Sequence, residues 1–230
     1  MTLSLFCKKL IGLIRYNYKI TNIRTPFGEP FNNSNHWVKT LQEYDDGLRD
    51  YKKSSLYKFH KNFKPRTIFD VMDLEQENLD KLMFTYPLGN YPWSRWVQPL
   101  SKERWLNTRH CGPSDDLVIE NEWNEFIILY ESIKSEGLRV KKYGHPIGLL
   151  FVDDNNTAYY IVLGGNHRTA VAAHLGVDFM PARLFARDFI DKQIIYYSDI
   201  ELLDNEDIEI SKKLFLTLVS DNFINWEEEI

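Results

Sequence analysis

The chain has 230 residues, of which 43% are hydrophobic and 14% aromatic, and it carries a formal net charge of -5 at pH 7. This hydrophobic fraction supports a packed core and excludes global disorder. The acidic balance argues against a general nucleic-acid binder, which carries a basic face. Cys7 and Cys111 are the only cysteines, too few for a disulfide framework, which favours a cytoplasmic protein.

Residues 1–20 have apolar side chains at helical spacing, with lysines and arginines around them. This pattern predicts an amphipathic helix that docks on the protein itself, on a partner, or on the inner face of a membrane. A signal peptide would need a longer apolar core and a small-residue cleavage site. No apolar run in the sequence is long enough to span a bilayer. Peripheral membrane contact through residues 1–20 therefore stays open.

Residues 1–105 read as an irregular, aromatic-rich helical region that packs on the rest of the chain. A helix is expected from Trp37 to Tyr51 and another from Ile68 to Leu74, separated by loop signals. Trp93 and Trp96 lie in a proline-interrupted segment. They are core residues or, alternatively, a wall on which a sugar stacks.

Residues 106–230 are more regular and predict an α/β (α+β) fold. Apolar residues at i, i+3, i+4 and i+7 predict a helix through Trp123 that Gly137 closes. Two strands around an Asp-Asp-Asn-Asn turn predict a hairpin. The expected elements are strands at 147–152, 158–163 and 180–185 and helices at 168–175 and 211–219.

The segment Gly164-Gly165-Asn166-His167-Arg168-Thr169 joins the second of these strands to a helix. Two glycines let the backbone pass close to a ligand, and a helix start offers unpaired N–H groups and the positive end of its dipole. The histidine, arginine and threonine side chains add donors. Residues 164–169 therefore predict a phosphate-binding turn. The alternative is a plain strand-to-helix turn whose His167 and Arg168 cap local carbonyls.

A run of polar residues, 109–116, precedes the helix through Trp123. Arg109, His110 and Ser114 are candidates for binding a substrate. The alternative for Ser114 and the two aspartates after it is a helix cap.

Glu120 and Glu122 follow on the same helix. A carboxylate there could act as a general base or hold Mg²⁺, and the sequence leaves open which of the two it is. The alternative is that both glutamates face solvent. No residue is assigned as a metal ligand.

The ordered segments from about Glu120 to Phe185, with the glycine turn at their centre, resemble the ParB/sulfiredoxin-like superfamily. The resemblance implies a small α/β core that binds nucleotide phosphates at the start of the helix after the turn. Sulfiredoxins have their catalytic cysteine where this chain has Asn166, which excludes their chemistry. Chromosome-partitioning members have an arginine-rich turn and bind CTP, whereas this turn has Arg168 alone.

The Gly-x-His-Arg form is most similar to free serine kinases of this fold, in which a glutamate near the start of the preceding helix acts on the acceptor hydroxyl. The Gly-Pro-Ser and Glu-Trp segments resemble proteins of surface-polysaccharide biosynthesis. The resemblance implies a kinase that uses ATP or ADP and Mg²⁺ to phosphorylate a small hydroxylated molecule, such as a sugar or polyol. Glu120, Glu122 and His167 are then the catalytic candidates.

Two other functions stay open at this point. One is a nucleotide-binding and nucleotide-hydrolysing switch of ParB type that regulates a partner. The other is a ParB-like nuclease or DNA-binding protein, which the acidic balance disfavours. The sequence leaves the acceptor and the oligomeric state open.

Overall fold

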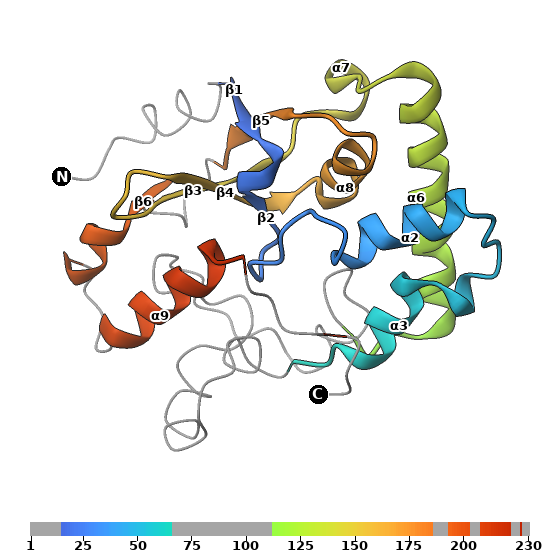
Figure 1. The fold of residues 1–230 in the computed structure, drawn as a ribbon, viewed down its shortest axis with the longest axis horizontal. Helices are drawn as coiled ribbons and strands as arrows, with labels where there is room; N and C mark the ends of the chain where they lie inside the picture. The colour runs from blue at the N-terminus through green and yellow to red at the C-terminus, as the bar shows by residue number, and fades with distance from the viewer. Residues whose placement is uncertain (1–14, 66–111, 186–192, 203–207, 222–225, 227–230) are drawn as a thin grey trace.

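The structure is a computed structural model in which the described residues are 15–65, 112–185, 193–202, 208–221 and Trp226 (Figure 1). Several expectations therefore lie outside the described residues: the helix at 68–74, the roles of Trp93 and Trp96, the substrate-binding roles of Arg109 and His110, and the boundary at 105/106.

A mixed six-stranded sheet forms the centre of the fold. Its strand order is β1-β5-β3-β4-β2, and β6 pairs with β3 beside this path. β1 is antiparallel to β5 and β3 is antiparallel to β4, whereas β2–β4, β3–β5 and β3–β6 are parallel pairs. The strands are β1 (Arg15–Lys19), β2 (Ile23–Arg24), β3 (Ile147–Val152), β4 (Ala158–Gly164), β5 (Phe179–Leu184) and β6 (Ile194–Tyr196).

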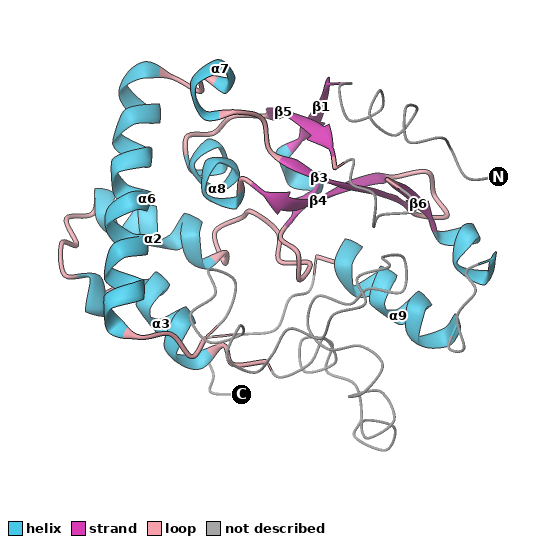
Figure 2. Ribbon diagram, turned by 180° about the vertical axis from the view of Figure 1, so that it is seen from behind, coloured by secondary structure: helices cyan, strands magenta, loops and turns pink. Residues whose placement is uncertain are grey.

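Helices lie on both faces of the sheet, with α2, α3, α6 and α8 on one side and α9 on the other (Figures 1 and 2). The α-helices are α2 (His36–Asp45), α3 (Ser55–Asn62), α6 (Asp116–Glu136), α7 (Val140–Tyr143), α8 (Asn166–His174) and α9 (Ile208–Val219). The 3-10 helices are η1 (Ile20–Asn22), η2 (Tyr51–Lys53) and η5 (Tyr197–Leu202).

Alternation along β4 divides the core into two clusters, because successive side chains of a strand point to opposite faces of the sheet. Tyr160 and Val162 pack against residues of α2, α6 and α8. Ile161, between them, packs against residues of α9. This arrangement places α8 between the sheet and the outer helices α2 and α6.

The mixed α/β class is confirmed, and β3 has the predicted bounds. The expected helix from Trp37 to Tyr51 is shorter, because α2 ends at Asp45 and Gly47 follows with φ +101°.

The expectation of an irregular, helical N-terminal region is wrong for residues 15–24, which form the edge strands β1 and β2. The end of the expected amphipathic helix at 1–20 is therefore a strand. Strand formation there depends on partners more than 100 residues away, which a local pattern does not reveal. Among the described helices, none combines the length and apolarity that crossing a membrane requires.

Candidate functional site

The glycine turn has the strand–turn–helix form that the sequence predicts. β4 ends at Gly164, and Gly165 has φ +101° and ψ 21°, so α8 starts directly after a left-handed residue. A Cβ on Gly165 would lie 3.0 Å from Cα of Pro146 and 2.9 Å from Nη2 of Arg168. The turn therefore requires glycine for its conformation and for its space.

The polar side chains of the turn differ in their burial and in their hydrogen-bond partners. Arg168 is half-buried, and its Nη1 donates to the carbonyl of Gly144 at 2.7 Å. Thr169 is fully buried and its hydroxyl donates to the carbonyl of Gly165 at 3.1 Å. Asn166 is also buried, and its Oδ1 has no hydrogen-bond partner in the described part of the chain.

This geometry corrects one part of the predicted cradle. The Thr169 hydroxyl is occupied inside the protein and does not face a ligand. The N–H groups of Asn166, His167 and Arg168 stand at the start of α8, where the helix itself supplies no acceptor. An anion at the turn would therefore meet mainly backbone donors, with the Arg168 guanidinium beside them.

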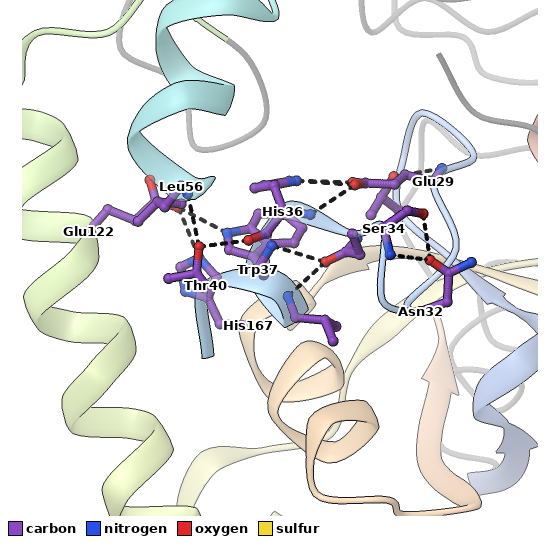
Figure 3. A network of polar contacts seen from close by, with 12 residues as sticks. Glu29, Asn32, Ser34, His36, Trp37, Thr40, Leu56, Glu122 and His167 are labelled. Atoms are coloured by element: carbon purple, nitrogen blue, oxygen red, sulfur yellow. Dashed lines mark hydrogen bonds and ion pairs between the residues drawn. The ribbon is translucent and has the colours of Figure 1, made fainter. Parts of the chain in front are cut away.

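His167 extends from α8 to Glu122 on α6. Its Nε2 lies 3.1 Å from Glu122 Oε1, and the same oxygen accepts a hydrogen bond from the indole N–H of Trp37 at 3.3 Å (Figure 3). The Glu122 side chain is 2% exposed and the His167 side chain 15%. The pair therefore places a buried carboxylate behind a partly exposed imidazole.

A second histidine lies against the other carboxylate oxygen. His60 of α3 is fully buried, and its Nε2 is 3.4 Å from Glu122 Oε2. This is an ion-pair distance, although the angle does not make a regular hydrogen bond. On the other side of the ring, His60 Nδ1 lies 3.2 Å from the hydroxyl of Ser114. Helices α2, α3 and α8 thus each bring a nitrogen to one glutamate of α6.

These contacts determine the charge of Glu122. Burial on its own raises the pKa of a carboxyl, but the hydrogen bond from His167, the close contact with His60 and the charges of the two rings hold the pKa of Glu122 well below its usual range. The carboxylate is therefore ionised at neutral pH and a poor proton acceptor. This geometry disfavours Glu122 as the general base and makes it the group that orients His167.

The ring of His167 is better placed to accept a proton. A proton on Nε2 satisfies Glu122 and leaves the lone pair of the neutral ring on Nδ1. Within the described residues, Nδ1 makes no hydrogen bond. The arrangement is a base whose other nitrogen is held by a carboxylate, as in acid–base dyads of enzymes.

Glu120 is not brought to this cluster. It is exposed, and at 100° per residue it stands about 200° around α6 from Glu122, which is buried. Its charge acts on Tyr51 instead.

Ser114 is 4% exposed and contacts His60, so it faces the interior and does not cap α6. The N-cap residue Asp115 makes no capping bond through its side chain. The aspartate after it, Asp116, lies 2.7 Å from Lys61 Nζ and 3.3 Å from Lys52 Nζ.

A neighbouring pair, Glu29 and His36, extends the network toward the loop before α2 (Figure 3). Glu29 Oε2 lies 3.1 Å from His36 Nδ1, and Glu29 Oε1 accepts the His36 backbone N–H at 3.1 Å. The His36 ring stacks on Phe59 with 3.5 Å between centroids. Burial lowers the pKa of His36, despite the opposing effect of Glu29. This buried pair anchors the start of α2, from which Trp37 reaches Glu122.

The described side chains do not suit a resident Mg²⁺. Glu122 Oε1 already accepts the indole N–H of Trp37 and lies 3.1 Å from His167 Nε2, and the buried Oε2 faces His60 Nε2 at 3.4 Å, whereas Mg²⁺ needs open oxygen ligands. Over the described ranges, no group of three or more His, Cys, Asp or Glu residues could hold a metal ion.

No family model, curated protein or solved structure matches the chain. The geometry also includes residues that the sequence did not indicate as functional, namely Trp37 and His60. Both lie in the N-terminal region, far from the glycine turn in sequence, and no spacing relates them to it.

Proposed function

We propose that the protein is a phosphotransferase, which moves a phosphoryl group from ATP or ADP to a hydroxyl of a small molecule. One observation carries this proposal: the Glu122–His167 pair stands at the start of α8, directly after the glycine turn. An acid–base group and an anion-binding helix start therefore lie on consecutive residues. The resemblance of the turn to that of free serine kinases gives the same reaction class.

The phosphates of the nucleotide bind at residues 164–168 in this proposal. Backbone N–H groups at the start of α8 and the Arg168 guanidinium hold the phosphate oxygens. The partial positive charge of the helix start stabilises the charge on the transferred group. Mg²⁺ arrives with the nucleotide phosphates, and no step depends on a protein ligand to it.

The proton of the acceptor hydroxyl goes to His167 Nδ1. The hydroxyl oxygen forms the new P–O bond, and the bond between phosphorus and the leaving nucleotide oxygen breaks, with the electron pair going to the nucleotide. Glu122 stabilises the imidazolium that forms, because its ionised carboxylate accepts a hydrogen bond from Nε2–H and opposes the positive charge of the ring. Glu122 and Trp37 therefore act on ring orientation and charge, and His167 acts on the substrate.

Phosphorus NMR tests this proposal directly. The full chain is mixed with ATP or ADP, Mg²⁺ and a panel of hydroxylated compounds that includes serine, sugars and polyols. A new phosphomonoester signal that requires the acceptor supports the kinase. Nucleotide hydrolysis at the same rate with every acceptor and with none contradicts it, and favours the nucleotide-dependent switch. Salt-sensitive DNA binding would favour a nucleic-acid function instead.

A further inference from the structure

His60 and Ser114 form a buried polar pair that the proposed reaction does not use directly. The His60 ring is 0% exposed and stands between two oxygens, Glu122 Oε2 at 3.4 Å from Nε2 and Ser114 Oγ at 3.2 Å from Nδ1. A buried imidazole in this position can satisfy both neighbours only in certain protonation states.

The contacts select one neutral form of the ring. If the proton were on Nδ1, the lone pair of Nε2 would face an ionised carboxylate oxygen, which places two acceptors together in a buried site. If the Ser114 hydroxyl donates a hydrogen bond to Nδ1, then Nε2 carries the ring proton and lies 3.4 Å from Glu122 Oε2. This second form has a hydrogen bond at Nδ1 and an attractive N–H contact with the carboxylate at Nε2.

The backbone keeps the Ser114 hydroxyl at this ring. The N–H of Ser114 donates to the carbonyl of His60 at 3.3 Å, and Lys61 Nζ donates to the carbonyl of Ser114 at 2.9 Å. Gly112 N–H donates to the carbonyl of Phe63 at 2.6 Å. Three hydrogen bonds therefore hold the segment 112–114 against the C-terminal end of α3.

We propose that Ser114 and His60 are positioning residues, which hold a ring N–H against Glu122 Oε2 and so set how strongly Glu122 Oε1 holds the ring of His167. This inference rests on the role given to His167 in the proposed function, and not on the identity of the phosphate donor or acceptor. Two other groups act on the same carboxylate, namely the Trp37 indole, through a hydrogen bond, and His36, through its charge. When the N–H contact at Oε2 is weaker, Oε1 keeps more negative charge, and its hydrogen bond with His167 becomes stronger.

The tautomer of His60 is measurable in the intact protein by long-range proton–nitrogen NMR of a sample with ¹⁵N-labelled histidine. We expect the Nε2–H form for His60 at pH 8. In Ser114→Ala, the Nδ1–H form becomes populated, and the Nε2 proton of His167 moves downfield, as for a stronger hydrogen bond to Glu122 Oε1. Ser114→Thr retains the hydroxyl and restores both signals. Ser55→Ala is the matched control, since its hydroxyl bonds to Glu43 at the start of the same helix.

An Nδ1–H tautomer of His60 in the unmodified protein overturns the proposal. So does a Ser114→Ala variant that folds normally but leaves the Nε2 proton signal of His167 in place. If this variant does not fold, two measurements decide the question: the tautomer of His60 in the unmodified protein, and the Nε2 proton signal of His167 in His60→Leu, which removes the ring N–H. None of these measurements depends on phosphoryl transfer. Failure of the kinase proposal and failure of the positioning proposal can therefore be distinguished.

Discussion

Glu122 Oε1 lies 3.1 Å from His167 Nε2, although the two residues are 45 positions apart and belong to different helices. Of the three catalytic candidates that the sequence indicates, Glu120, Glu122 and His167, the structure brings the last two together. In the proposed reaction the buried carboxylate orients the ring and the partly exposed ring accepts the proton.

Replacing His167 by glutamine should remove the proton acceptor while keeping a side chain that can bond to Glu122. We expect the rate of phosphoryl transfer to fall by about 10²- to 10⁴-fold, the usual contribution of a general base. Phosphorus NMR or a coupled assay measures it. The matched control is His174→Gln at the other end of α8, whose ring lies 2.9 Å from Asp45. Equal losses in both variants would contradict a catalytic role for His167.

Replacing Glu122 by glutamine should alter stability in a pH-dependent way. The pKa of Glu122 is lowered in the folded state from its usual 4.5. Its stabilising effect is therefore fully present above that usual value and is lost as the pH falls below it. At pH 7 we expect Glu122→Gln to cost about 3 kcal/mol, as for a broken buried ion pair.

Urea unfolding from pH 7 to pH 3 measures this dependence. The free-energy difference between the unmodified protein and Glu122→Gln should shrink as the pH falls. Glu120→Gln is the control, because the Glu120 side chain is exposed. A difference that stays constant over this range would mean that Glu122 is not held ionised by its neighbours.

Removing the Arg168 guanidinium should weaken nucleotide binding. A charged hydrogen bond to phosphate contributes about 1.5 to 3 kcal/mol, so Arg168→Ala should lower affinity roughly 10- to 100-fold by calorimetry. Arg139→Ala controls for net charge, since Arg139 is exposed and pairs with Glu136. An unchanged nucleotide affinity in Arg168→Ala would place the phosphates elsewhere.

Replacing Gly165 by alanine should disturb the turn more than a positive φ alone explains. Gly47 has the same φ, +101°, but a Cβ there meets nothing within 4 Å. Gly47→Ala should therefore cost about 1 kcal/mol, a fall of about 2 to 4 °C in Tm. Gly165→Ala adds overlap with the Pro146 backbone, so its Tm should fall further and nucleotide binding should weaken. Equal effects on Tm would show that the close approach is unimportant.

The second half of the fold was predictable because its signals are local. Alternation and a polar turn give β3 and β4, helical spacing gives α6, and two glycines mark the start of α8. The edge strands were not predictable. β2 has two residues, too few for a pattern, and β1 becomes a strand by pairing with β5 at the opposite end of the chain.

The same distinction applies to the site. The sequence indicated His167 through the form of its turn, and Glu120 or Glu122 through the resemblance to kinases in which a glutamate of the preceding helix acts. It gave no reason to select Trp37 or His60, since only tertiary packing brings α2 and α3 to Glu122. Burial likewise cannot be deduced from spacing, and burial with three nitrogen neighbours is the reason why we propose Glu122 as an orienting carboxylate and not as a base.

Helices α2 and α6 are joined twice. Trp37 bonds to Glu122, and eight residues further along each helix Asp45 accepts a hydrogen bond from Tyr130 at 2.6 Å. Two helices can rotate about a single contact, but two contacts about 12 Å apart along each axis prevent both rotation and sliding. Because His167 and His174 of α8 contact these same two points, the helix that carries the glycine turn is fixed at both ends. The turn is therefore part of a rigid frame, and a ligand at the proposed phosphate site would bind with little change in the backbone.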